Sequence, residues 1–288
     1  MSRLVALHAV CNRTGIFERL ILPALYPFMK RVALLLFTMA CAPLPGSQNQ
    51  VDGFVARVYQ QAGKTMPYRL FIPPKYNKSR KYPLIVWLHG GSGSGTDNLR
   101  QIQGDQIPGT RIWTAAENQA KNPAFVVVPQ SAEGGWDFTG EPIRPTKSDP
   151  QADGQLTAQL SQVIGILDSL KMEFQIDPRR LYVAGQSMGG YGTWNLITKR
   201  PDLFAAAVIL CGGGSPELAP NVKDMPIWSF QGDADNQNFV TPNRNMIAAI
   251  RKAGGNPRYT EYPGMGHEIW DRVFKEPGLV EWLFAQHR

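Results

Sequence analysis

The sequence predicts a three-layer α/β fold, in which helices cover both faces of a mostly parallel sheet that begins with an antiparallel N-terminal hairpin. The first observation behind this prediction is that apolar runs of strand length alternate with stretches of helix length. The second is that several of these runs are continuously apolar, which is typical of parallel strands buried on both faces. The 288 residues are 43% hydrophobic, and this is enough for one sizeable core.

Eight segments are predicted as strands. The first two, joined through residues 61–64, are expected to form the antiparallel hairpin at the edge of the sheet. Right-handed crossovers are expected to join the later strands. In chain order, the predicted strands are 54–59, 68–72, 84–88, 125–128, 181–184, 206–210, 227–230 and 258–262.

Five segments are predicted as helices. The second of them carries leucine, valine and isoleucine at three- and four-residue spacings, which places these side chains on one face. Residues 131–154 are rich in glycine, proline and aspartate and are predicted to form a long loop that shapes a substrate site. The predicted helices are 110–119, 156–171, 188–198, 242–253 and 279–286.

The chain divides into a leader at residues 1–41, a polar linker at 42–52 and a catalytic domain at 53–288. The leader has a short basic start, nine apolar residues and small residues before Cys41. This pattern describes a secretory signal peptide, with Met29 as the expected true start. The apolar run is shorter than the roughly 20 residues that a membrane-spanning helix needs.

Three outcomes are open for this leader. Residues 38–41 resemble the lipobox of bacterial lipoproteins, which predicts an acylated Cys41. Ordinary cleavage around residues 40–42 is the second outcome. In the third, residues 20–28 join the run as one spanning helix, although two prolines and two cations argue against it. All three imply export, so we expect a periplasmic, secreted or membrane-anchored protein.

The formal net charge is +7, but residues 1–41 carry five basic residues and one acidic residue. Most of the excess therefore belongs to the leader, and without a basic run in the rest no nucleic-acid partner is expected. We expect a monomer whose only membrane contact is the possible anchor at Cys41. Cys211 follows an apolar run and is predicted to be a buried hydrophobic residue.

The motif Gly185-Gln186-Ser187-Met188-Gly189 follows one predicted strand and opens the next predicted helix. A strand, a tight turn and a helix are the setting that a nucleophile elbow requires. The flanking glycines permit a turn too tight for side chains. A hydroxyl is a poor nucleophile without a base and without donors for the oxyanion. Ser187 is therefore predicted to be a nucleophile that other groups activate.

The base and the acid are predicted from loops that follow late strands, where the sites of open parallel sheets gather. Of four histidines, His267 is the one in such a loop. The loop after 227–230 offers two carboxylates. We favour Asp235, because the chain can turn after Gly232 before presenting it, and expect Asp233 to bond its own backbone in an Asx turn. A serine–aspartate–histidine order fits this architecture.

Two backbone N–H groups are predicted to hold the oxyanion. One is that of Met188, and the other comes from the glycine-rich loop after strand 84–88, with Gly91 as the first choice and Ser92 next. This loop lacks the Gly-Lys-Ser/Thr ending of a phosphate-binding loop. His89 is expected to be structural. The sequence shows no metal-ligand cluster, so neither a metal nor a cofactor is expected.

Several motifs resemble those of secreted esterases of the α/β-hydrolase superfamily, relatives of feruloyl esterases, acetylxylan esterases and polyhydroxybutyrate depolymerases, some of which are known as predicted peptidases. The resemblance covers roughly residues 54–286. It implies an α/β-hydrolase fold and a serine–aspartate–histidine triad. The motifs that carry it are 68–73, 88–91, 95–98, 185–194 and 262–267.

Two features depart from the pattern of these relatives. Gln231 stands where relatives often have histidine, at a position not thought to be catalytic. Residues 236–239 separate the predicted acid from Val240, whereas relatives often reach this valine sooner. The longer segment leaves the choice between Asp235 and Asp233 open.

The favoured function is hydrolysis of a carboxylic ester through an acyl-enzyme. A serine peptidase of prolyl-oligopeptidase type is the alternative, but about 50 residues before the core cannot supply the large extra domain of those enzymes. A non-enzymatic binding protein of this fold is a third, although all three triad residues are present.

The expected substrate is a small-molecule or polysaccharide-linked ester, with short acyl, acetyl, feruloyl and polyester groups all open. Trp136 either stacks on a sugar or phenolic acid or covers the edge of the core. Trp194 and Trp270 are expected to pack in the core.

Overall fold

The computed structural model describes residues 50–61, 63–132, 135–136 and 155–288. The predicted leader, Cys41 and most of the predicted linker and long loop lie outside these residues. At the end of the predicted linker, β1 (Gln50–Val51) pairs with β2. Among the described residues, no helix is both long enough and apolar enough to cross a membrane.

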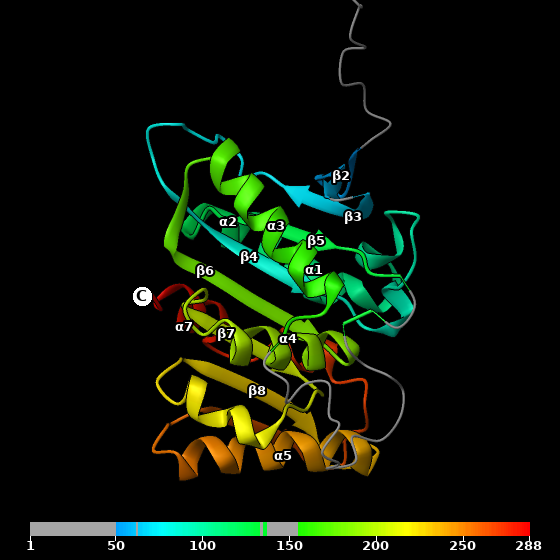
Figure 1. Cartoon of the computed structure of the whole chain (residues 1–288), viewed down its shortest axis with the longest axis vertical. Coiled ribbons are helices and arrows are strands. Elements are labelled where there is room, and N and C mark those ends of the chain that lie inside the picture. Colours follow the sequence, from blue (N-terminus) through cyan, green and yellow to red (C-terminus); the bar gives the residue numbers. More distant parts are fainter. Residues whose placement is uncertain (1–49, 62, 133–134, 137–154) are drawn as a thin grey trace, which may run out of the picture. The chain divides into compact units, whose positions relative to one another are not determined.

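One nine-stranded sheet organises the described part of the chain, in the order β1-β2-β3-β5-β4-β6-β7-β8-β9 (Figure 1). Every pair from β5 to β9 is parallel, whereas β1, β2 and β3 pair antiparallel, as does β3 with β5. The predicted hairpin at the edge is therefore present. The further strands are β2 (Phe54–Gln61), β3 (Lys64–Phe71), β4 (Tyr82–Leu88), β5 (Phe125–Pro129), β6 (Ile176–Gln186), β7 (Ala206–Leu210), β8 (Ile227–Gly232) and β9 (Arg258–Tyr262).

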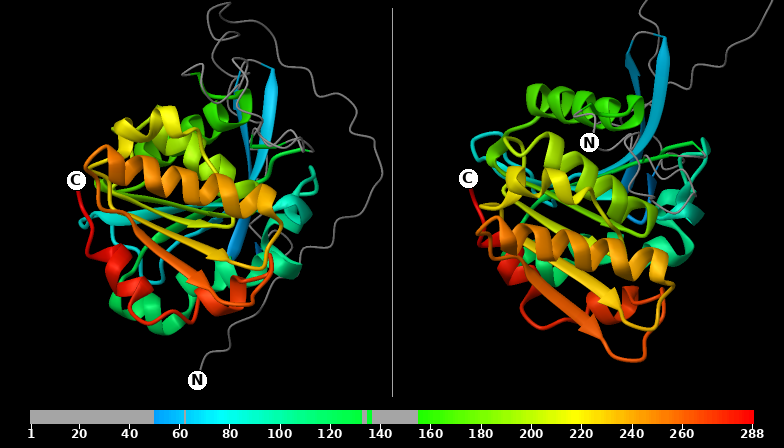
Figure 2. Two further views of the ribbon diagram at one scale, coloured as in Figure 1. Left: turned by 90° about the horizontal axis from the view of Figure 1, so that it is seen from below. Right: turned by 60° about the horizontal axis from the view of Figure 1, so that its bottom comes forward.

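Helices cover both faces of this sheet (Figure 2). Short 3₁₀ helices lie at Gly91–Gly93, Arg100–Ile102, Gly104–Gln106 and Pro216–Val222. The α-helices are α1 (Ile107–Thr114), α2 (Ala116–Lys121), α3 (Ala158–Glu173), α4 (Met188–Lys199), α5 (Gln237–Lys252), α6 (Trp270–Val273) and α7 (Leu279–Phe284).

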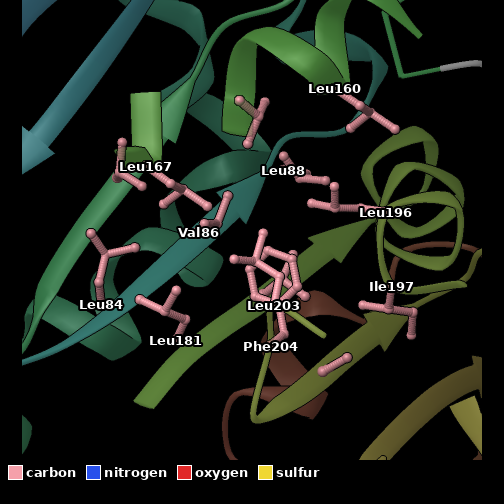
Figure 3. Packing of buried hydrophobic residues seen from close by; sticks show 14 of the residues in the cluster. Leu84, Val86, Leu88, Leu160, Leu167, Leu181, Leu196, Ile197, Leu203 and Phe204 are labelled. Carbon is pink, nitrogen blue, oxygen red and sulfur yellow. The ribbon is translucent and has the colours of Figure 1, made fainter. Parts of the chain in front are cut away.

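Alternate residues of the central strands enter two separate hydrophobic clusters. In β4, Leu84, Val86 and Leu88 pack toward α3 and α4 (Figure 3). Helix α5 contributes residues to the same cluster. Ile85 and Trp87 point to the opposite face, where α1, α6 and α7 contribute their apolar residues. This is the two-residue period of a strand that is buried on both sides. The three-layer arrangement predicted from the apolar runs is thus present.

The structure differs from the prediction at two helices. The predicted helix 110–119 is divided, because Ala115 is extended (φ −54°, ψ 134°) between α1 and α2. Helix α5 begins at Gln237, five residues before the predicted start at Pro242. Proline has no N–H for the carbonyl one turn earlier, and the Tyr191 hydroxyl donates to that carbonyl, Asn238 O, at 2.8 Å. A contact with α4 therefore allows the proline inside the helix.

Candidate active site

Ser187 lies between β6 and α4 in a strained turn. Its backbone has φ 53° and ψ −118°. This is the positive-φ half of the Ramachandran map, which residues other than glycine avoid. A Cβ added at Gly185 would lie 2.3 Å from Gly189 O, and one added at Gly189 would lie 1.9 Å from Leu88 O. Because these obstacles are backbone atoms, both glycines are required. The turn matches the predicted elbow and holds a half-buried serine at its apex.

Two hydrogen bonds join the three predicted triad side chains. Ser187 Oγ lies 2.8 Å from His267 Nε2, and His267 Nδ1 lies 2.7 Å from Asp235 Oδ2. An ionised carboxylate can only accept, so the His267 proton is assigned to Nδ1, which leaves Nε2 to accept from the hydroxyl. The Asp235 side chain is 3% exposed and that of His267 is 30% exposed. The arrangement can therefore move a proton from Ser187 while the acid stays shielded from water.

The loops after β8 and β9 are tied together, and this places the acid beside the base. Since β8 and β9 are parallel, both loops leave the same edge of the sheet. Ala234 N donates to Met265 O at 3.0 Å. Gly264 N donates to Asp233 Oδ1 at 2.7 Å. The Asx turn predicted for Asp233 is wrong, because its carboxylate accepts from the other loop. Of the two candidate carboxylates, Asp235 is the one that contacts His267.

Aromatic and sulfur groups surround the imidazole. The rings of Phe239 and Trp270 have centroids 4.3 Å and 5.4 Å from that of His267. The buried Cys211 thiol donates to His267 O at 3.4 Å, and burial raises the pKa of Cys211. Ligand-type atoms of Cys211, Asp235 and His267 lie within 4.8 Å of one another. The hydrogen bond between Asp235 and His267 occupies those atoms, which favours the triad over a metal site.

The two residues predicted to form the oxyanion hole each begin a helix, Met188 that of α4 and Gly91 the first 3₁₀ helix. Leu88 at the end of β4 pairs with Gly185 at the end of β6, so the segments that follow begin side by side. A Cβ at Gly90 would lie 3.4 Å from Gln186 side-chain atoms. Gly91 and Met188 are the first residues of their helices, so neither N–H is used within the helix, and in the described part of the chain neither donates a backbone hydrogen bond in a loop or cap. Both amides are therefore available to a developing oxyanion.

Trp136 packs behind this loop. It is 0% exposed, its Nε1 donates to His89 O at 3.0 Å, and its ring centroid lies 5.1 Å from that of His89. A Cβ at Gly192 of α4 would lie 2.6 Å from Trp136 Cβ. A tryptophan enclosed in this way has no face left for a substrate. The geometry agrees with the core-edge alternative for Trp136 and argues against sugar stacking.

His89 is held neutral within the glycine-rich loop. Its Nδ1 lies 2.7 Å from Gly90 O, and its Nε2 lies 3.1 Å from Ser131 N, whose N–H can only donate. The proton is therefore assigned to Nδ1. Burial lowers the pKa of His89 from an ordinary value of 6.5 to about 4, against the smaller opposing effects of Gly90 O and Asp105. These bonds match the structural role expected for His89.

The low pKa of His89 predicts a loss of stability in acid. The unfolded chain takes up this proton near pH 6.5 and the folded chain only near pH 4, so the contribution is complete above pH 6.5 and is lost as the pH falls through this window. The expected loss is about 3 kcal/mol. Urea unfolding at pH 7.5 and 4.5 should show a smaller drop for His89→Asn than for wild type or for the exposed-site control His287→Asn. Equal drops in all three proteins would contradict the assignment.

The chain is similar to a known protein family and to several known proteins. The family described as "Putative esterase" matches residues 60–276. "Probable feruloyl esterase C" of Aspergillus niger is 25% identical over 219 residues, which are 72% of this chain and 68% of that protein. The chain also superposes on a solved thermostable esterase with a TM-score of 0.75 and 36% identity, covering 83% of this chain and 64% of the other.

A solved peptidase shares the fold at lower sequence identity. The dipeptidyl peptidase 4 of Porphyromonas gingivalis superposes with a TM-score of 0.59 and 14% identity. The match covers 81% of this chain and 36% of the peptidase. At this identity the likeness concerns the fold alone.

Proposed function

The chain belongs to this esterase family and has the α/β-hydrolase fold, and from that premise we propose that it hydrolyses carboxylic esters through an acyl-enzyme. One observation carries the proposal: the unbroken hydrogen-bond chain from Ser187 Oγ through His267 to Asp235, at 2.8 and 2.7 Å. This geometry supports the roles proposed for the three side chains: Ser187 as nucleophile, His267 as base and Asp235 as acid.

In the first half of the reaction, Ser187 Oγ attacks the ester carbonyl carbon as its proton passes to His267 Nε2. Asp235 holds the imidazole in the required tautomer and stabilises the imidazolium. The N–H groups of Met188 and Gly91 stabilise the oxyanion. The carbon–oxygen bond to the alcohol then breaks, and the alcohol takes the proton from His267. Ser187 is left acylated.

In the second half, water attacks the acyl carbon while His267 Nε2 takes a proton from it. The bond to Ser187 Oγ breaks, the acid leaves, and the proton returns to the serine. The net reaction is ester plus water to acid plus alcohol. The 30% exposure of the His267 side chain gives water access to the base that must activate it.

The substrate class that we favour is an acyl ester of a polysaccharide, with acetyl and feruloyl groups first and polyesters next. The relationship to proteins named as feruloyl esterases supports this choice. Purified protein should be tested on p-nitrophenyl acetate, methyl ferulate, acetylated xylan and a peptide anilide. Hydrolysis of p-nitrophenyl acetate and of at least one of the next two is expected. Cleavage of the anilide without ester hydrolysis would contradict the proposal and support the peptidase alternative.

We also propose that the protein is exported and, more specifically, that it is acylated at Cys41. The basic start and apolar run before Cys41 support it, as does similarity to an uncharacterised secreted protein of Arthroderma benhamiae. Expression with a fatty-acid analogue should label the wild type and Cys11→Ala but not Cys41→Ala. Label that persists in Cys41→Ala would refute acylation at this residue.

A further inference from the structure

A row of buried polar side chains lies behind the proposed catalytic acid. Ser229 and Gln231 are two residues apart in β8 and therefore point to the same face of the strand. That face is covered by α5, which runs beside β8 and supplies Asn243 (Figure 1). All three side chains are 0% exposed. Polar groups in such a place are costly unless they are hydrogen-bonded to one another or to the backbone.

Hydrogen bonds connect these groups in one direction. Ser229 Oγ donates to Asn243 Oδ1 at 2.8 Å, and Asn243 Nδ2 donates to Gln231 Oε1 at 3.1 Å. Gln231 Nε2 donates to Asp235 Oδ2 at 2.9 Å. Each amide accepts a hydrogen bond from the preceding group through its oxygen and donates one to the following group through its nitrogen. The row therefore ends with an N–H group pointing at the carboxylate.

The backbone determines which way the amides face. Asn243 Nδ2 also lies 3.4 Å from Phe230 O, and a carbonyl oxygen can only accept. The amino end of Asn243 is thus required on the side of Gln231, so Gln231 must present its oxygen there. Its amino end is left facing Asp235. Gln231 Nε2 also lies 3.4 Å from Gly232 O, a second acceptor that favours the amino end on this side.

Gln231 and His267 donate hydrogen bonds to the same oxygen atom of Asp235. Asp235 Oδ2 receives both Gln231 Nε2 and His267 Nδ1, and Asp235 Oδ1 receives the N–H of Asn236 at 2.6 Å. With this side chain 3% exposed, water cannot replace a lost donor. A buried carboxylate needs several donors to stay ionised and fixed in direction. The glutamine side chain does not titrate, so its donor is present at every pH.

We propose that Gln231 is a positioning residue for ester hydrolysis. It acts through Asp235, and Asn243 and Ser229 hold its amide in the effective orientation. The inference rests on the proposed function, because it assigns Gln231 a part in the same proton transfer. Its failure would leave the proposed function standing, because ester hydrolysis would continue without Gln231, at a lower rate.

The test compares two buried glutamines. Gln119 is 5% exposed and bonds Trp113 O and Ala124 O, away from the triad. Gln231→Met is expected to lower kcat on p-nitrophenyl acetate by about ten- to hundredfold, the range seen when outer hydrogen-bond partners of metal ligands are removed. KM should stay within about twofold, because the substrate contacts are unchanged. Gln119→Met should lower the melting temperature without lowering kcat.

A double-mutant cycle distinguishes positioning from general damage. If Gln231 acts through Asp235, adding Gln231→Met to Asp235→Ala should change the residual kcat by less than about twofold. A loss that persists undiminished in the Asp235→Ala background would overturn the proposal, as would unchanged kcat in Gln231→Met alone. Wild-type activity on the same ester is the separate test of the proposed function.

If Gln231→Met does not fold, Asn243→Ser takes its place in the same cycle. This change removes the donor that fixes the Gln231 amide, so kcat should fall in the wild-type background and not in Asp235→Ala. Unchanged kcat in Asn243→Ser would overturn the proposed role of the row.

Discussion

Ser187→Ala is expected to abolish ester hydrolysis while leaving the fold intact. Loss of a triad serine costs about a millionfold in kcat in a serine protease, and a similar loss is expected here because no other hydroxyl bonds His267 among the described residues. The strained turn does not depend on the hydroxyl, since its geometry follows from Gly185 and Gly189. The measurement is kcat on p-nitrophenyl acetate, alongside circular dichroism and melting temperature.

The matched control for this variant is Ser161→Ala, which removes an exposed hydroxyl from α3. It should retain wild-type kcat and a wild-type melting temperature. If Ser187→Ala kept more than a small residue of activity while the control behaved as expected, another nucleophile would have to be sought.

Asp235→Asn has the second largest expected effect. The substituted amide can present an N–H toward His267 Nδ1, which would favour the wrong imidazole tautomer and leave the imidazolium uncompensated. The corresponding change in a serine protease lowers kcat by about 10⁴-fold, and a loss of this order is expected. KM should change little, because the carboxylate is buried away from the substrate. Steady-state kinetics on the purified variant give both constants.

Asp233→Asn is the informative partner of that variant. Its Oδ1 accepts from Gly264 N, and an amide oxygen can accept the same bond. Only the charge is lost, and because a hydrogen bond to a charged group contributes about 1 kcal/mol more than one to a neutral group, kcat should fall by less than about tenfold. The reverse ranking of the two variants would transfer the acid role to Asp233.

Much of the fold could be predicted because buried parallel strands have continuously apolar sequences. The predicted strands 206–210 and 258–262 coincide with β7 and β9, and two short runs joined by a glycine turn predict the edge hairpin. The start of α5 at Gln237 differs from the predicted start at Pro242 for a physical reason. Proline usually marks a helix start, but here a long-range hydrogen bond from Tyr191 satisfies Asn238 O, the carbonyl for which Pro242 has no N–H.

The candidate site was predictable where local sequence determines geometry. The glycines around Ser187 dictate the elbow, and loops after parallel strands bring Asp235 and His267 to one edge. The contact between Asp233 and Gly264 joins two loops 31 residues apart, so nothing near either residue indicates it. The role of Trp136 likewise depends on its distant partners, His89 and Gly192.

The polar row beside Asp235 leaves a signal in the sequence of β8. In the otherwise apolar strand β8, serine and glutamine occupy positions two apart. Two polar side chains on one face of a buried strand require partners on the covering helix. Identifying Asn243 as that partner needs the packing of α5 on β8, which the sequence does not specify residue by residue.

The central claim is that Ser187 is the nucleophile, and covalent labelling tests it most directly. Wild type, Ser187→Ala and Ser161→Ala should be incubated with a fluorophosphonate, and their intact and peptide masses measured. Wild type and Ser161→Ala are expected to gain one phosphonyl group, located on Ser187, and folded Ser187→Ala to gain none. A label on a different residue of wild type, or equal labelling of Ser187→Ala, would contradict the account.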